Sequence, residues 1–296
     1  MRLFIPPTKR YDIRALRDLG FEVVDRKWRA VSVTGRWCEL MCKHCYGVLL
    51  EYMERLTSLG DAMRLVREGI KGVLISGGCD KRGRVPFERS LSALKLLRDS
   101  GVELYAHTGL LDRASASIAS DLGFRVCMFD VFTPLTAKLV RNLDGFTLRD
   151  LGSCLELCKE MGLRCAPHIV IGELCGKPSG ELELIDFLSS YDIEQVNLVV
   201  FTPLPGTPFE ECDPPPYDYI IKVLRRAREI LSKSALALGC MKPSWGRYRL
   251  LELEAIEMGF DAIAAPNMDT LARCRVLGIN VIEVGCCSML AGASSG

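Results

Sequence analysis

The chain has little of several features that mark whole classes of protein. No apolar run approaches the roughly 18 residues that a membrane-spanning helix needs, so we expect no such helix. The 38 Lys and Arg residues nearly balance the 37 Asp and Glu residues, and no long basic run occurs, which argues against nucleic-acid binding. The opening residues MRLFIPPTKRYDIR have only a short apolar patch before two prolines, so we expect no signal peptide.

Cysteine, by contrast, is abundant, with 14 residues in 296. In a small secreted protein this count would predict a disulfide framework. A chain of this length buries enough surface to fold without disulfides, and it shows no export signal. We therefore expect a cytoplasmic protein in which some thiols serve metal chemistry and others fill the core.

Short β-rich runs alternate with amphipathic helical segments along the whole chain. The β-rich runs are residues 30–35, 72–77, 103–108, 125–131, 164–172, 196–201, 235–241, 262–266 and 281–286. This alternation predicts parallel βαβ units and an α/β fold. Eight units favour a (β/α)8 TIM-type barrel (residues 29–296), with the ninth run as a C-terminal extra strand and residues 1–28 as a leader packed outside. An open, doubly wound sheet has the same local pattern and stays an alternative.

Three cysteines lie close together in TGRWCELMCKHCYG (34–47), directly after the first predicted strand of the barrel. Cys38, Cys42 and Cys45 have the spacing C-x3-C-x2-C. Three thiolates can hold three irons of a [4Fe–4S] cluster, which leaves the fourth iron open to a small ligand such as the amine and carboxylate of an amino acid. The alternative is structural zinc, but zinc takes four ligands and no second C-x2-C or H-x3-H pair lies nearby.

This loop resembles the signature of the radical S-adenosylmethionine superfamily, and three further stretches fit it: SGG (76–78), HIVIG (168–172) and FTPLPGTP (201–208). The resemblance implies S-adenosylmethionine as cosubstrate, a ferredoxin-like electron donor and a 5′-deoxyadenosyl radical that removes hydrogen from an unactivated carbon. It implies cosubstrate contacts from Tyr46, Ser76, Gly77, Gly78, His168, Ile171, Gly172, Glu173 and Pro203. The chain departs from the family pattern at His44, where an aromatic residue is usual, and at Cys79, where Glu is frequent.

Four more cysteines follow predicted strands, at the barrel edge where catalytic groups gather. They are Cys79, Cys240, Cys286 and Cys287. We expect these thiols to hold an auxiliary iron–sulfur cluster, the alternative being that each is a buried core thiol. For Cys127, Cys154, Cys158 and Cys165 we expect core positions, and Cys175, Cys212 and Cys274 stay unassigned.

Two of the three histidines, His107 and His168, are expected on the same catalytic side. They are the candidates for a catalytic role, through hydrogen bonds to the cosubstrate or a polar network. The alternative is that both are ordinary buried histidines.

The stretches SVTGRWCELMCKHCYG, LISGGCDKRGRVP, AHTGL, GCMKP and GCC are most similar to the biotin-synthase-related group that includes the two-component lipoyl synthases. That resemblance implies sulfur insertion into a protein-bound octanoyl group, with an octanoylated carrier protein and a paralogous partner. Two alternatives stay open: a radical mutase or lyase with one cluster, and a non-catalytic iron–sulfur subunit.

Overall fold

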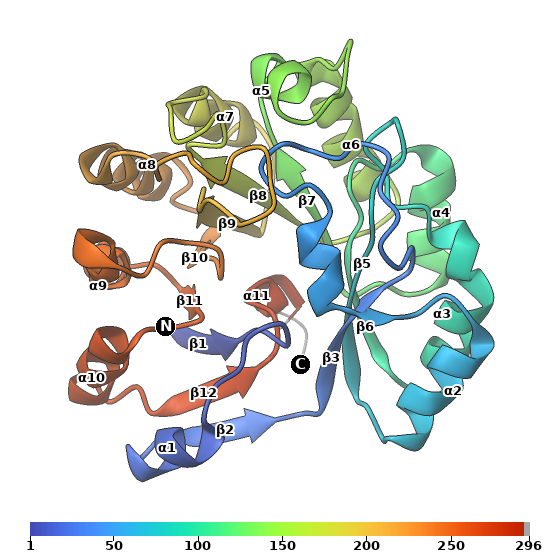
Figure 1. Cartoon of the computed structure of the whole chain (residues 1–296), viewed down its shortest axis with the longest axis horizontal. Helices are drawn as coiled ribbons and strands as arrows, with labels where there is room; N and C mark the ends of the chain where they lie inside the picture. Colours follow the sequence, from blue (N-terminus) through green and yellow to red (C-terminus); the bar gives the residue numbers. More distant parts are fainter. Residues whose placement is uncertain (293–296) are drawn as a thin grey trace.

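The computed structural model describes residues 1–292, with side chains up to residue 290. Twelve strands form one curled, all-parallel sheet in the order β2-β12-β1-β11-β10-β9-β8-β7-β6-β5-β3-β4 (Figure 1). The strands are β1 (Arg2–Ile5), β2 (Glu22–Asp25), β3 (Trp28–Ser32), β4 (Glu54–Arg55), β5 (Gly72–Ser76), β6 (Glu103–His107), β7 (Cys127–Val131), β8 (Cys165–Ile171), β9 (Gln195–Val200), β10 (Ala235–Leu238), β11 (Ala262–Ala264) and β12 (Val281–Val284).

From β5 to β11 the strands follow one another in both chain and sheet order. A doubly wound sheet would instead reverse its strand order at a switch point. The α/β class and the TIM-type architecture are therefore confirmed. Within the described residues no ladder joins β2 to β4, so the barrel is a curled sheet that stays open on one side.

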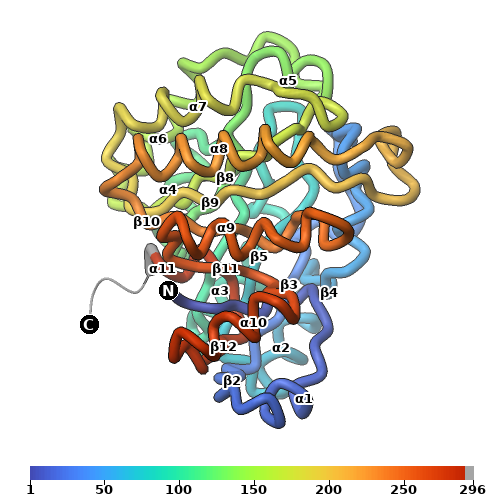
Figure 2. Tube along the Cα trace, turned by 90° about the vertical axis from the view of Figure 1, so that its left-hand side faces the viewer, coloured from blue at the N-terminus to red at the C-terminus, as the bar shows by residue number. Residues whose placement is uncertain are grey.

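Helices cover the outer face of the sheet, and Figure 2 shows α7, α8 and α9 side by side on that surface. The helices are α1 (Ile13–Asp18), α2 (Leu59–Arg67), α3 (Leu91–Asp99), α4 (Arg113–Asp121), α5 (Pro134–Leu139), α6 (Leu148–Glu160), α7 (Glu181–Leu188), α8 (Tyr217–Ile230), α9 (Leu251–Glu257), α10 (Met268–Val276) and α11 (Met289–Gly292). Side chains satisfy the free amides at several helix starts. At α2, for example, Ser58 and Asp61 form a capping box. None of the helices in residues 1–292 has the length and apolar character needed to cross a membrane.

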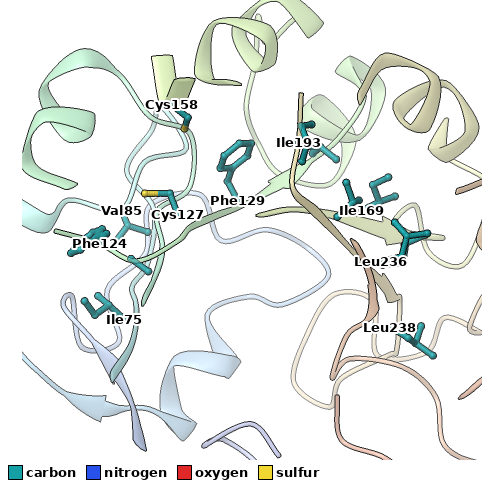
Figure 3. Packing of buried hydrophobic residues seen from close by; sticks show 14 of the residues in the cluster. Ile75, Val85, Phe124, Cys127, Phe129, Cys158, Ile169, Ile193, Leu236 and Leu238 are labelled. Carbon is teal, nitrogen blue, oxygen red and sulfur yellow. The ribbon is translucent and has the colours of Figure 1, made fainter. Parts of the chain in front are cut away.

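The sheet separates two cores. The outer core lies between strands and helices and includes Cys127, Cys158 and Ile169 (Figure 3). The inner core fills the curl of the sheet and contains Phe4, Trp28, Tyr105, Met128, Cys286, Cys287 and Met289. Because successive residues of a strand face opposite sides, Cys127 and Cys165 point outward while His168 points into the barrel. The core positions expected for Cys127, Cys154 and Cys158 agree with their burial.

Residues 1–28 were expected to pack on the outside of the barrel. In the structure they contribute strands to the sheet itself. Leu3 pairs with Ile263 of β11 on one side and with Ile282 of β12 on the other, so β1 is an internal strand of the sheet. β2 then extends the sheet beyond β12. The reason is packing: Leu3, Phe4 and Ile5 are almost fully buried between the two last strands of the chain. The division into a leader and a barrel domain stays a prediction.

Candidate active site

The three-cysteine loop leaves the carboxyl end of β3 and is held by the segment after α5. Lys43 N donates to Val140 O at 2.8 Å, and Asn142 Nδ2 donates to Leu40 O at 2.7 Å. Within the loop, Tyr46 N donates to Cys42 O at 2.7 Å. Tyr46 has a φ of 44°, in the left-handed region, which turns the chain sharply after Cys45. The loop is thus folded back on itself rather than extended into solvent.

The thiols of this loop already interact without any metal. A hydrogen bond with Cys42 holds the pKa of Cys45 well below its usual value, against the effect of burial, and His44 acts in the same direction. The pKa of Cys42 is correspondingly raised. The two opposite shifts have one main cause, the hydrogen bond between the side chains of Cys42 and Cys45.

The glycine motif packs directly against this loop. Ser76 lies in register with Ser32 on the neighbouring strand. A Cβ atom on Gly78 would overlap Trp37 O and would stand 2.5 Å from the Cα atom of Cys38. The amide of Gly78 donates to Thr34 Oγ1 at 2.7 Å. The close approach of the two segments therefore requires glycine at position 78.

A buried ion-pair network lies beside the cysteine loop. Arg141 contacts Asp130 at 2.9 Å and Glu173 Oε1 at 2.6 Å, and its guanidinium lies 4.3 Å from the ring centre of Phe132. Burial alone would raise the pKa of Asp130, but Arg141 lowers it to about 2. The Glu173 side chain is only 2% exposed and also pairs with His44 Nδ1 at 3.2 Å. Glu173, which is predicted to contact the cosubstrate, is thus already engaged by two basic groups.

The two candidate histidines meet inside the barrel. The ring centres of His107 and His168 are 5.1 Å apart. His168 Nδ1 lies 3.0 Å from Ala166 O, and His168 Nε2 lies 3.1 Å from Asn197 Nδ2. A carbonyl oxygen only accepts and the amide nitrogen only donates, so Nδ1 carries the proton and His168 is neutral. Burial lowers the pKa of His168, and burial together with His168 lowers that of His107 to about 4.

The structure divides the four cysteines expected to hold an auxiliary cluster. Cys240, Cys286 and Cys287 lie together in or against the inner core, and their charges act on one another. Cys286 Sγ also lies 3.7 Å from Met128 Sδ. Cys79 lies elsewhere, because its carbonyl accepts from Glu39 N of the three-cysteine loop at 2.8 Å.

Within the described part of the chain, no three or more His, Cys, Asp or Glu side chains are arranged to hold one metal ion. Structural zinc takes four ligands around one point. A [4Fe–4S] cluster instead takes one thiolate at each of several irons, and its ligands stand further apart. Three thiols on a folded loop, with Cys38 packed against the glycine motif, fit a cluster with three protein ligands.

The remaining residues predicted to contact a cosubstrate have mixed positions. Tyr46 is 44% exposed beside the cysteine loop. Gly172 donates its amide to Glu181 Oε1 at 2.6 Å, so that amide is already occupied. Ile171 belongs to the outer core, so its side chain faces away from the barrel interior. Pro203 lies in the loop after β9 and is partly buried.

A disulfide between Cys175 and Cys212 joins the loops that follow β8 and β9, with Cα atoms 5.3 Å apart. Neither cysteine had an assigned role in the sequence, and no disulfide was expected. The loop around Cys175 is tight, because Gly176 N donates to Gly172 O at 2.8 Å. The bridge therefore fixes the chain immediately after Glu173.

The chain matches no protein-family model and no curated protein by sequence. Its structure is similar to that of methylornithine synthase (PylB), with a TM-score of 0.58 and 15% identity over 92% of this chain and 90% of that one. It is also similar to HydG, a maturase of the [FeFe]-hydrogenase, with a TM-score of 0.63 and 13% identity over 98% and 73% of the two chains.

The HMG-CoA lyase from Brucella melitensis is a third similar structure, with a TM-score of 0.51 and 13% identity over 90% of this chain and 95% of that one. This chain shares their fold. Because one fold serves several chemistries, the cysteine loop and not the barrel must carry the functional argument.

Sequence reasoning missed several residues of the site. Arg141 follows a helix rather than a strand, so the rule that active-site groups follow strands gives no signal for it. Gln195 and Asn197 did leave a signal, since two polar residues alternate at the start of an otherwise apolar strand. Gln195 Nε2 donates to Asn197 Oδ1 at 2.6 Å and to Cys287 O at 2.9 Å. These residues connect the histidines to the C-terminal cysteines.

Proposed function

We propose that this protein is a radical S-adenosylmethionine enzyme. The observation that carries the proposal is the folded C-x3-C-x2-C loop at the carboxyl end of β3, packed against the glycine motif after β5. The similarity of the fold to PylB and HydG supports it. Cys38, Cys42 and Cys45 would hold a [4Fe–4S] cluster, and Ser76, Gly77 and Gly78 would bind the methionine part of the cosubstrate.

When bound, the cluster and S-adenosylmethionine supply a 5′-deoxyadenosyl radical that removes hydrogen from an unactivated carbon. The protein residues bind and orient the reactants, and they exclude water from them. Arg141 pairs with Glu173, which pairs in turn with His44 of the cysteine loop, and the inner core fills the curl of the sheet. Neutral His107 is partly open to the interior, where it can offer a hydrogen bond to a bound substrate.

We further propose that the enzyme inserts sulfur, as a lipoyl-synthase-like sulfurtransferase. Cys240, Cys286 and Cys287 would hold an auxiliary iron–sulfur cluster that serves as sulfur donor. Their convergence on the inner core supports this assignment. The substrate would be an octanoyl group on a carrier protein, with a paralogous radical enzyme as partner and ferredoxin as electron donor.

One observation favours a second candidate, a radical mutase or lyase with a single cluster. The partly exposed His107 offers the barrel interior a polar group, which suits a polar substrate better than a hydrocarbon chain. In that case Cys240, Cys286 and Cys287 are core thiols. A non-catalytic subunit is the third candidate, and it would not cleave S-adenosylmethionine.

Counting iron and sulfide after anaerobic reconstitution tests these candidates. Three proteins are compared: the wild type, the Cys38→Ala/Cys42→Ala/Cys45→Ala variant and the Cys240→Ala/Cys286→Ala/Cys287→Ala variant. Two clusters predict about eight irons in the wild type and about four in each variant. About four irons in the wild type and in the second variant would reject sulfur insertion. Absence of reductive S-adenosylmethionine cleavage by a fully loaded wild type would reject radical chemistry.

A further inference from the structure

Cys79 is a fourth thiol beside a loop that needs only three. It follows β5 after the glycine motif, and its carbonyl accepts from Glu39 N at 2.8 Å. The preceding Gly78 is in contact with the backbone of Cys38 and is tied to Thr34. These contacts fix the backbone of Cys79 against the cysteine loop on two sides.

The thiol of Cys79 belongs to the same group of side chains. It is partly buried and packs against the outer core, which the side chains of Cys38 and Cys45 also contact. The charges of Cys38 and Cys45 act on Cys79, and Cys79 in turn acts on Cys42. Burial raises the pKa of the Cys79 thiol to about 12, and the positive charge of Arg141 opposes this rise. The fourth thiol is therefore within the electrostatic range of each of the other three.

We propose that Cys79 binds the fourth iron of the cluster when no cosubstrate is present, and that S-adenosylmethionine displaces it. The exchange breaks one iron–sulfur bond to Cys79 and forms bonds from the iron to the amine nitrogen and the carboxylate oxygen. The ammonium group of the cosubstrate gives up one proton as its nitrogen binds the iron, the released thiolate takes up one proton, and no electron is transferred. The open iron is thereby protected until the cosubstrate arrives. This inference rests on the first cluster of the proposed function but not on sulfur insertion.

The test uses a chain that carries only the first cluster, the Cys240→Ala/Cys286→Ala/Cys287→Ala variant, with and without Cys79→Ala. Both proteins are reconstituted anaerobically and oxidised mildly in the absence of S-adenosylmethionine. A cluster with four thiolate ligands retains its iron, whereas one with three loses the iron that has no protein ligand. We expect the parent to keep about four irons and Cys79→Ala to fall to about three, with the electron paramagnetic resonance signal of a [3Fe–4S] cluster.

The affinity for S-adenosylmethionine gives a second readout, measured by equilibrium dialysis. If the thiolate occupies the iron in about nine of ten molecules, removing it should lower the apparent Kd about tenfold. Cys274→Ala, which removes a buried thiol on α10, serves as control and should change neither readout. Where the background variant does not fold, the same comparison is made in the otherwise wild-type chain by difference spectroscopy.

Two results would overturn the inference. Equal iron loss in the two proteins would show that Cys79 does not bind the cluster. A higher Kd in Cys79→Ala would show that the thiol contacts the cosubstrate instead of competing with it. Both results are read from the first cluster alone, so neither depends on whether the auxiliary cluster exists.

Discussion

Gly78 leaves no room for a side chain between the glycine motif and the cysteine loop. A methyl group there would overlap Trp37 O and press on Cys38. We expect Gly78→Ala to displace the loop, to destabilise the fold by about 1–3 kcal/mol as overpacking does, and to lose about four irons per chain. Iron analysis together with a urea unfolding curve measures both effects.

Gly60→Ala is the matched control for this substitution. Gly60 lies in α2, where a Cβ atom would stand 3.6 Å from Ser58 Oγ in ordinary contact. Alanine favours helix, so this variant should keep its iron and gain slightly in stability. Full iron loading of Gly78→Ala would show that the cysteine loop tolerates displacement from the glycine motif.

His107 makes a separate prediction about pH. Its folded pKa of about 4 lies below the unfolded value of 6.5, because burial and neighbouring His168 disfavour its charge while Asp130 favours it. The unfolded chain therefore binds the proton first, and stability is lost as the pH falls from 6.5 through 4. Complete protonation lowers the contribution of His107 to the free energy of unfolding by about 3 kcal/mol.

The His107→Asn variant cannot take up this proton and isolates the effect. Unfolding free energies of the wild type and the variant are measured from pH 7 to pH 4, so that the titration of carboxylates cancels in the difference. We expect the variant to lose less stability than the wild type over this range. If the unfolding free energies of the two proteins changed in parallel with pH, His107 would be solvated and its pKa would not be lowered.

At the scale of elements, β9 holds the C-terminal segment inside the barrel. Asn197 Nδ2 donates to Ser288 Oγ at 2.6 Å as well as to His168, and Gln195 holds Cys287 O. Asn197→Ala leaves His168 Nε2 and Ser288 Oγ without this partner, at about 1–3 kcal/mol for each buried group. We expect faster amide hydrogen exchange in residues 285–290 and, under the two-cluster proposal, loss of about four irons.

Asn280→Ala is the control, because Asn280 is exposed in the turn before β12. It should leave both the exchange rates and the iron count unchanged. If Asn197→Ala exchanges at the wild-type rate, the segment is held by packing of Cys286 and Met289 alone. Iron loss without faster exchange would also contradict the positioning role of Asn197.

The elements themselves could be predicted where the sequence carries a local period. Each of the nine β-rich runs became a strand, because alternation with amphipathic helices fixes both their type and their parallel arrangement. β1, β2 and β4 were not predicted, and for β1 and β4 the reasons differ. β4 is only two residues long, and the four residues of β1 are stabilised by strands near the other end of the chain. No local pattern can reveal such a partner.

The same limit applies to the candidate site. The strand-end rule predicts that Cys38, Cys240 and Cys286 lie on one edge, and they follow β3, β10 and β12. It cannot tell which of them share a cluster, because that depends on how far apart the strands lie around the curl. Cys79 was grouped with the C-terminal cysteines, although β5 neighbours β3 and places it beside Cys38.

At the scale of the whole molecule, β1 joins the two ends of the chain into one sheet. Its neighbours β11 and β12 come from residues 262–284, and Figure 1 shows the C-terminal α11 inside the curl next to them. β1 pairs with β11 on one side and with β12 on the other, so without β1 the sheet would be interrupted between these two late strands. The first residues are therefore required for the position of Cys286 and Cys287, which follow β12 directly.

Phe4 tests this dependence. Its side chain is fully buried in the inner core that also contains Cys286 and Cys287. Phe4→Ala should lower the free energy of unfolding by about 3–5 kcal/mol, whereas Leu19→Ala, at a residue 43% exposed in the same N-terminal region, should change it by no more than about 0.5 kcal/mol. Both values come from urea unfolding. Equally small changes in the free energy of unfolding for both variants would contradict this dependence and favour an outer leader for residues 1–28. A strand inside the sheet cannot lose its largest side chain without a loss of stability.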